Sequence, residues 1–135
     1  MLSIKSIMTK DVVTVTPETP IYDAMRLLMR HRISGMPVVD EQMHVKGVLS
    51  EKDVLQILID SNIKYKDTVV DYMTKDVISF SEDESAVKVC QFFIKNHFRR
   101  VPIVKDGKLI GIVSRRDLIE LILEANNKIS NDRLD

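Results

Sequence analysis

The pentapeptide Met8-Thr-Lys-Asp-Val12 recurs as Met73-Thr-Lys-Asp-Val77, identical at all five positions and 65 residues further along the chain. With a shift of one residue, Gly47-Val-Leu-Ser-Glu-Lys-Asp53 likewise corresponds to Gly111-Ile-Val-Ser-Arg-Arg-Asp117. Agreement at separate places in the same order indicates an internal duplication, which constrains the fold more than any single segment does. Further equivalent positions are Pro37 with Pro102 and Val39 with Val104.

The duplication predicts two domains of similar build. We expect repeat 1 over residues 1–65, repeat 2 over residues 66–125, and a polar, frayed C-terminal tail over residues 126–135. One repeat alone would bury too little apolar surface to be stable. The two repeats are therefore expected to pack against each other about a pseudo-two-fold axis, which leaves two related clefts between them. Clefts at such internal interfaces are common ligand sites.

Within each repeat the residue pattern predicts strand, helix, strand, strand, helix, which is an α/β (α+β) fold. The first helix is expected to begin at Pro20 with Thr19 as its N-cap, and its counterpart to begin after the cap Ser85. Proline within the middle strands predicts that they start at the periphery of the sheet. The expected strands are Val12–Val15, Met36–Val39, Val45–Leu49, Val77–Phe80, Val101–Val104 and Leu109–Val113, and the second helices follow Ser50 and Ser114.

Composition and charge restrict the class of protein. The 135 residues suit one domain or two very small ones, and 44% hydrophobic with 30% charged residues is typical of a globular chain. Twenty basic residues balance twenty acidic ones, which argues against a nucleic-acid-binding protein. The apolar runs are too short for a membrane-spanning helix, and the N-terminus lacks the apolar core of a secretory signal. Cys90 is the one cysteine, so no disulfide can form within the chain and a reducing compartment is expected. Together these features predict a cytoplasmic protein with no membrane partner.

Ser50 with Asp53, and Ser114 with Asp117, have the spacing of a capping box at a helix start. The same spacing also suits a nucleotide site, because a helix N-terminus favours a phosphate through its free N–H groups and its dipole. The serine hydroxyl can contact a phosphate, and the aspartate can accept hydrogen bonds from both ribose hydroxyls. The preceding glycine would allow close backbone approach. The residue types alone leave both interpretations open.

Three features recur in the same order in both halves of the chain. Each half starts with Met-Thr-Lys-Asp-Val, here called its opener, continues with Gly-Met-Pro-Val-Val or Arg-Val-Pro-Ile-Val, and ends with Gly-x-x-Ser-x-x-Asp. Together these features resemble the tandem CBS domain, a family named after cystathionine β-synthase. The resemblance covers about residues 7–124 and implies two tandem β-α-β-β-α CBS repeats. It implies a regulatory module that binds an adenine-containing ligand, commonly AMP, ADP or ATP and sometimes S-adenosylmethionine or NAD. It also implies that such pairs dimerise into a flat disc.

The resemblance further implies which residues line the two clefts. In one cleft Ser114 and Asp117 would hold phosphate and ribose, and Arg99 and Arg100 would reach the phosphates. In the mirror cleft Ser50 and Asp53 would take the corresponding roles, but Ser34 and Gly35 stand at the positions of the two arginines. The adenine would be enclosed by Met8, Val13, Ile33 and Ser34 in the first cleft and by Met73, Ile78, Phe98 and Arg99 in the second.

Charge distinguishes the two clefts. Residues 95–117 carry seven basic and two acidic residues, a balance of +5, whereas residues 30–53 carry four of each. Positive charge concentrated in one part of a neutral chain favours a bound polyanion. We therefore expect the cleft that contains Ser114 and Asp117 to bind phosphate-bearing ligands more tightly.

No catalytic or metal site is expected, and the protein is interpreted as a non-enzyme without a cofactor. His31, His44 and His97 lack the paired spacing of zinc ligands, and the sequence has no nucleophile elbow and no Walker-type phosphate loop. Two interpretations remain. One is a ligand-sensing module that signals to another, unknown polypeptide. The other is a structural dimerisation module whose clefts stay empty or bind nucleic acid. The apolar helices after Ser50 and Ser114 predict a homodimer.

Overall fold

The computed structural model describes residues 3–59 and 67–134, with side chains to residue 129. Contacts divide the chain into two compact units, which are considered separately. The first-repeat unit consists of Asp11–Ile78 and Asp106–Leu109, and the second-repeat unit consists of Met1–Lys10, Ser79–Lys105 and Ile110–Asp135.

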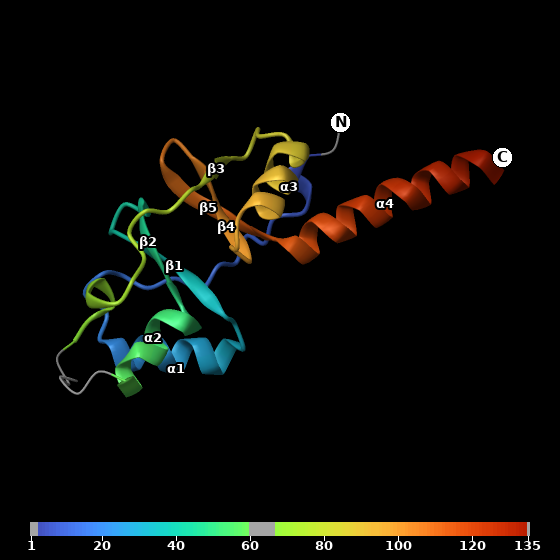
Figure 1. The fold of residues 1–135 in the computed structure, drawn as a ribbon. Coiled ribbons are helices and arrows are strands. Elements are labelled where there is room, and N and C mark those ends of the chain that lie inside the picture. The colour runs from blue at the N-terminus through green and yellow to red at the C-terminus, as the bar shows by residue number, and fades with distance from the viewer. Residues whose placement is uncertain (1–2, 60–66, 135) are drawn as a thin grey trace. The chain divides into compact units, whose positions relative to one another are not determined.

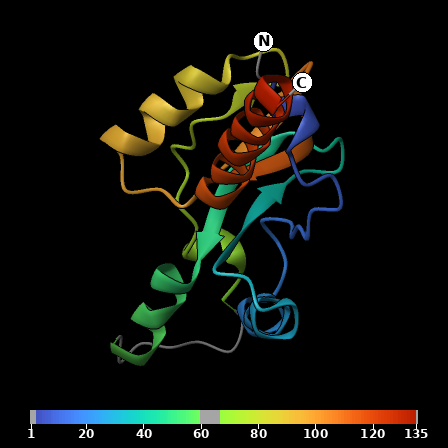
Figure 2. The same ribbon diagram turned by 90° about the vertical axis from the view of Figure 1, so that its right-hand side faces the viewer.

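The first-repeat unit is built on an antiparallel hairpin, in which Met36 pairs with Leu49 and a bulge lies between Val38 and Val39. Val15 adds a parallel bridge to Val38. Figures 1 and 2 show the two helices at the same end of this hairpin. A buried cluster that includes Val15, Ile21, Leu28, Val38 and Leu49 forms its core. The elements are α1 (Ile21–His31), β1 (Gly35–Val39), β2 (Val45–Ser50), α2 (Glu51–Ile59) and the 3₁₀ turn η2 (Val69–Asp71).

The second-repeat unit has a three-stranded sheet in the order β3-β4-β5, with β3 parallel to β4. The turn that joins β4 to β5 belongs to the first-repeat unit, and its residues Asp106 and Gly107 are left-handed with φ of 52° and 78°, as suits a tight hairpin. Helix α3 packs against the start of α4, and Figure 1 shows α4 continuing beyond it. The elements are η1 (Ile4–Ser6), β3 (Phe80–Ser81), α3 (Ala86–Lys95), β4 (Arg100–Lys105), β5 (Lys108–Ser114) and α4 (Arg115–Leu134).

The Met-Thr-Lys-Asp-Val openers of the two repeats are exchanged, because each forms backbone hydrogen bonds with a strand of the other repeat. Thr9 pairs with Ile112 of β5 through N–H···O bonds of 2.9 and 3.0 Å, and Thr74 pairs with Val48 of β2 at 2.9 and 3.0 Å. Each opener thus adds to the last strand of the other repeat. Each compact unit therefore combines segments of both repeats.

Gly47 and Gly111 make this exchange possible, because each opener crosses directly over one of these glycines. A Cβ atom on Gly47 would lie 2.6 Å from the carbonyl oxygen of Thr74, and one on Gly111 would lie 2.7 Å from the sulfur of Met8. We expected the glycine of each motif to give room for close backbone approach. The approaching backbone is that of the opener.

Several expected elements are confirmed. Helices α2, α3 and α4 begin directly after Ser50, Ser85 and Ser114 as expected, and α1 begins at Ile21, one residue after the expected Pro20. Ser85 caps α3 by accepting hydrogen bonds from the N–H groups of Val87 and Lys88. The proline-containing strands form as β1 and β4. Pro102, however, lies in the central strand of its sheet and not at the periphery, and the parallel pairing with β3 starts at Ile103. The missing N–H therefore falls just before the paired stretch.

Three expectations about local structure are wrong. The strand predicted at Val12–Val15 is reduced to the bridge at Val15, and the one predicted at Val77–Phe80 shrinks to the two residues of β3. Thr19 does not cap α1, because its Oγ1 accepts a hydrogen bond from the Thr16 N–H at 3.0 Å, and Pro20 takes the N-cap position. Residues 126–134 do not fray but continue α4.

Candidate functional site

The start of α4 is fixed by a complete capping box. The Ser114 N–H donates to Oδ2 of Asp117 at 2.7 Å, and the Asp117 N–H donates to Oγ of Ser114 at 3.2 Å. Both residues are half-buried. The capping interpretation of the Ser-x-x-Asp motif is therefore confirmed. The box uses Oδ2 of the carboxylate and the lone pairs of the hydroxyl, so Oδ1 and the hydroxyl proton take no part in it.

The start of α2 has the same geometry. The Ser50 N–H donates to Oδ2 of Asp53 at 2.9 Å, and the Asp53 N–H donates to Oγ of Ser50 at 3.2 Å. The two helix starts therefore differ in the charge around them and not in their caps.

A backbone hydrogen bond ties the segment before the middle strand to each helix start. The Arg115 N–H donates to the Arg99 carbonyl at 3.4 Å, and the Glu51 N–H donates to the Ser34 carbonyl at 2.9 Å. Arg99 is thus brought together with Ser114 and Asp117. The capping box and this bond already use two of the first three amides of α4. A phosphate at α4 would therefore depend on side chains more than on the helix amides that the sequence suggested.

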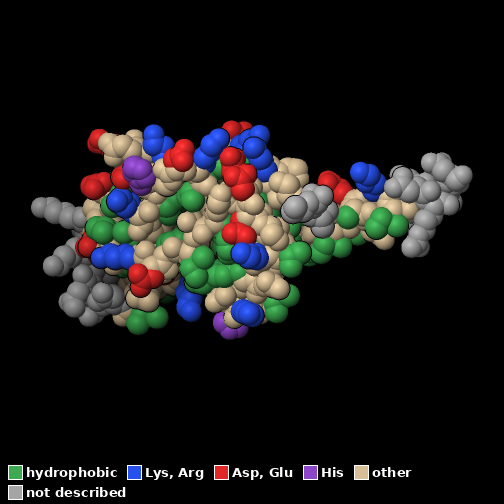
Figure 3. All heavy atoms as spheres, turned by 90° about the horizontal axis from the view of Figure 1, so that it is seen from above, with side chains coloured by type: hydrophobic (Ala, Val, Ile, Leu, Met, Phe, Trp, Pro, Cys, Tyr) green, Lys and Arg blue, Asp and Glu red, His purple; other side chains and the backbone are tan. Residues whose placement is uncertain are grey.

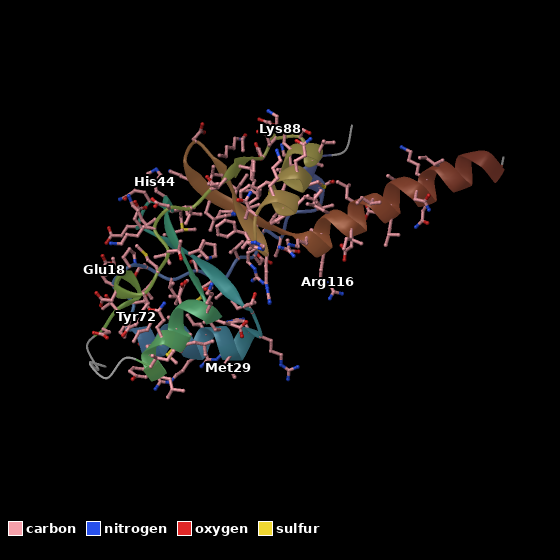
Figure 4. All side chains as sticks on the ribbon, viewed as in Figure 1. Glu18, Met29, His44, Tyr72, Lys88 and Arg116 are labelled. Atoms are coloured by element: carbon pink, nitrogen blue, oxygen red, sulfur yellow. The ribbon has the colours of Figure 1, made fainter. Side chains whose placement is uncertain are left out.

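Arginines gather at the start of α4. Arg99, Arg115 and Arg116 are exposed and Arg100 is half-buried. The Arg115 Nε–H donates to the Phe98 carbonyl at 3.2 Å, which holds this guanidinium over the loop. Figure 4 shows Arg116 pointing away from the first turn of α4. The start of α2 has Glu51 and Lys52 at the positions of Arg115 and Arg116, so no comparable excess of positive charge forms there.

The predicted adenine-contacting residues pack to different degrees within their own units. Phe98 is 45% exposed, and its ring stacks on Phe92 with centroids 5.7 Å apart and planes 9° from parallel. Met8 and Met73 lie over the glycines of β5 and β2. Val13 and Ile33 are partly buried against the first-repeat core, whereas Ile78 is 48% exposed.

The expected site residues fall into two half-sites. The second-repeat unit holds Met8, Phe98, Arg99, Arg100, Ser114 and Asp117. The first-repeat unit holds Val13, Ile33, Ser34, Ser50, Asp53, Met73 and Ile78. Each proposed cleft draws residues from both sets, so the pairing of half-sites into clefts stays a prediction.

The first-repeat unit also contains a hollow. Its volume is about 580 Å³, and Pro17, Asp40, Lys46, Met73 and Lys75 are among the residues that line it. Of the expected site residues only Met73 takes part, and neither capping box does. The hollow is therefore a feature separate from the helix starts.

Asp40 anchors the turn between β1 and β2. Its Oδ1 accepts hydrogen bonds from the N–H groups of Gln42 and His44, both at 2.9 Å. Desolvation raises the pKa of Asp40, but these hydrogen bonds and the electrostatic interactions with His44 and Lys46 outweigh it and hold the pKa below its usual value. The charged carboxylate therefore stabilises the turn.

Sequence reasoning missed one buried charge. Glu82 is 8% exposed and forms ion pairs with Lys5 at 3.8 Å and Lys105 at 3.4 Å, which join the N-terminal segment to β4. It lies in the acidic run Ser81–Glu84, which by composition resembles an ordinary exposed turn. Its ion pairs with Lys5 and Lys105 join parts of the chain that are distant in sequence.

Among the side chains of residues 3–59 and 67–129, no three His, Cys, Asp or Glu groups are placed to hold a metal ion together. Over the same described residues, no helix is both long and apolar enough to cross a bilayer.

The duplicated motifs agree with a known family. The family model of the CBS domain matches the sequence twice, over residues 4–60 and 69–124. The chain belongs to the CBS domain family. The expected family is thereby confirmed, and with it the fold class of two repeats of mixed helix and strand.

Two solved CBS structures resemble this chain closely. The first is CBSX2 in complex with AMP, at 28% identity and a TM-score of 0.84, covering 93% of this chain and 99% of the other. The second is the CBS domain pair of MJ0100 in complex with 5′-methylthioadenosine and S-adenosyl-L-methionine, at 29% identity and a TM-score of 0.77, covering 91% and 97%.

Two proteins of Methanocaldococcus jannaschii are longer relatives. This chain is 30% identical over 119 residues to MJ1225 and 35% identical over 115 residues to inosine-5′-monophosphate dehydrogenase. These alignments cover 88% and 84% of this chain but only 42% and 22% of the relatives. The chain therefore corresponds to part of each relative and not to the whole.

Proposed function

We propose that this CBS protein is a regulatory module that binds an adenine nucleotide, AMP, ADP or ATP, and signals its presence to a partner protein. The observation that carries this proposal is the start of α4, where the capped Ser114 and Asp117 lie beside Arg99 in a strongly basic stretch. The nucleotide-bound CBSX2 supports the same class of ligand.

Each part of a nucleotide has a matching group at this helix start. Oδ1 of Asp117 lies outside the capping box and can accept hydrogen bonds from the ribose hydroxyls. The hydroxyl proton of Ser114 can be donated to a phosphate oxygen. Arg99 and Arg116 are exposed and can form charge-assisted hydrogen bonds with the phosphate, which are the stronger kind.

S-adenosylmethionine is the second candidate ligand, because MJ0100 was crystallised with it. Its sulfonium group carries a positive charge, which the arginines around Ser114 would repel. The start of α2, with Glu51 and Lys52 and no arginine pair, carries no such excess. We therefore infer that the α4 half-site prefers phosphate-bearing ligands, and that any S-adenosylmethionine binds at the α2 half-site.

We also propose that the module works as a cytoplasmic homodimer. Leu55, Leu58 and Ile59 of α2 are 64%, 89% and 84% exposed, and α4 exposes further apolar side chains. Exposed apolar surface on neighbouring turns of a helix favours burial against a partner. The single Cys90 suits a reducing compartment.

The ligand class is tested by thermal unfolding of the purified chain with millimolar AMP, ATP, adenosine and S-adenosylmethionine. A ligand at about a hundredfold excess over its dissociation constant stabilises the fold by about 2.7 kcal/mol. We expect AMP and ATP to raise the melting temperature more than adenosine does. Unchanged melting with all four ligands would refute adenine-nucleotide sensing.

An Arg99→Gln variant tests the role of the arginines, with Arg30→Gln on α1 as the matched control. Losing one charge-assisted contact of about 1.5–3 kcal/mol should weaken AMP binding about tenfold to a hundredfold. Arg30 is exposed but lies outside the proposed site, so its variant should bind AMP as the wild type does.

A further inference from the structure

Helix α4 continues beyond the domain that defines the family. The CBS match ends at residue 124, whereas α4 runs to Leu134. Figure 1 shows no other described element of the second-repeat unit beside the distal half of α4. Figure 3 shows hydrophobic side chains along this projecting part.

An apolar seam runs along α4. Ile119, Ile122 and Ile129 are 55%, 55% and 52% exposed, and the exposed Asn126 lies between the last two. Their spacing of three, four and three residues is that of the a and d positions of a coiled coil. The seam, defined as these four residues, is therefore a stripe of two heptads with one polar position.

The core of the second-repeat unit uses a different face of α4. Leu118 and Leu121 are 4% and 5% exposed and belong to that core. On a helix with about 100° per residue, the seam lies to one side of these leucines. The unit folds without covering the seam, so the seam is available to another chain.

The seam starts in an apolar groove between α3 and α4. The groove has a volume of about 320 Å³ and is lined by Cys90, Phe93, Ile94, Ile119 and Ile122 among others. Ile94 is 83% exposed. The apolar surface thus continues from the globular part onto the projecting helix, which extends the area that a partner can bury.

We propose that α4 pairs along the seam with α4 of a second copy, as a short parallel two-stranded coiled coil. This inference rests on the homodimer proposed above and specifies its contact. Asn126 decides the orientation. In a parallel pair its amide faces Asn126 of the partner subunit, and each amide can donate to and accept from the other. An antiparallel pair that matches Ile119 to Ile129 would bury Asn126 against an isoleucine with no polar partner, which is costly.

Disulfide cross-linking in a Cys90→Ser background tests the orientation. In the parallel pair, Ile122→Cys lies opposite its own copy and should form a cross-linked dimer on mild oxidation. A mixture of Ile119→Cys and Ile129→Cys chains should form no 119–129 disulfide, because ten helical residues separate these positions by about 15 Å. The opposite result, a 119–129 disulfide and no cross-link at 122, would overturn the parallel seam.

Sedimentation of Ile129→Lys and the matched control Asn127→Lys tests the seam itself. Both variants add a lysine to the same turn, but residue 127 lies off the seam. Ile129→Lys should weaken dimerisation more than tenfold and Asn127→Lys should leave it unchanged. If the wild type and the Ile129→Lys variant were equally dimeric, pairing along the seam would be refuted but the homodimer would not. A monomeric wild type at tens of micromolar would refute the homodimer with it.

Discussion

Replacing Gly47 by alanine should destabilise the fold through the exchanged opener. The new Cβ would lie 2.6 Å from the Thr74 carbonyl oxygen, a backbone atom that accepts a hydrogen bond from the Val48 N–H at 3.0 Å. Overpacking of this kind costs about 1–3 kcal/mol. Because the clash also strains the Val48–Thr74 pairing, we expect a loss of about 2–3 kcal/mol and a fall in melting temperature of roughly 8 °C.

Gly111→Ala provides an internal comparison. Its closest contact, at 2.7 Å, is the sulfur of Met8, the mobile end of a flexible side chain, and the Thr9 carbonyl oxygen is 3.0 Å away. We expect a smaller loss of about 1 kcal/mol. Adding Met8→Ala should reduce the cost of Gly111→Ala, whereas Met73→Ala should not reduce that of Gly47→Ala, because there the obstacle is backbone.

Urea unfolding followed by circular dichroism measures these differences in the absence of ligand. Unchanged stability of Gly47→Ala would refute the reasoning. Unchanged stability combined with weaker ligand binding would instead indicate that the glycine makes room for a ligand and not for the opener.

Two further predictions concern the caps and one turn. Ser50→Ala and Ser114→Ala should each lower the free energy of unfolding by about 1 kcal/mol, because each removes one hydrogen bond of a capping box. Thermal unfolding without ligand measures this loss. A loss of stability in only one of the two variants would contradict the matched geometry. The pKa of Asp40 is lowered in the folded state, so its stabilising effect is present above the unfolded pKa and is lost as pH falls through the folded pKa. The stability difference between wild type and Asp40→Asn should therefore be present at pH 7 and shrink toward pH 3 in unfolding titrations, and a difference independent of pH would refute the role of the charge.

The sequence predicted most of what depends on local pattern. Apolar residues at helical spacing placed α1 and α3, and the Ser-x-x-Asp motifs placed the starts of α2 and α4. The continuation of α4 was missed because its polar composition after Ala125 suggested a tail, although the stretch contains neither glycine nor proline to end a helix.

Features that depend on distant partners were not predictable in the same way. The β-branched run Val12–Val15 suggested a strand, but strand structure needs a hydrogen-bonded neighbour, and only Val15 finds one. The exchange of openers pairs Thr9 with Ile112, which lies about 100 positions further along the chain. No periodicity within one segment records such a pairing.

The half-sites show the same difference between features set by local sequence and features set by distant contacts. The spacing of Ser114 and Asp117 identified a helix start, and the structure adds that Arg99 is tied to it by a backbone hydrogen bond. The bond from Arg115 to the Phe98 carbonyl was not expected, because it depends on how the loop before β4 folds back onto α4.

Calorimetric titration of AMP into the wild type, Asp53→Ala and Asp117→Ala tests the central claim most directly. The two variants lose equivalent capping boxes, so each controls for the structural effect of the other. We predict that Asp53→Ala keeps the tight binding event and that Asp117→Ala loses it, because only the α4 half-site combines a ribose acceptor with arginines. Loss of tight binding in Asp53→Ala alone, or in neither variant, would contradict the account.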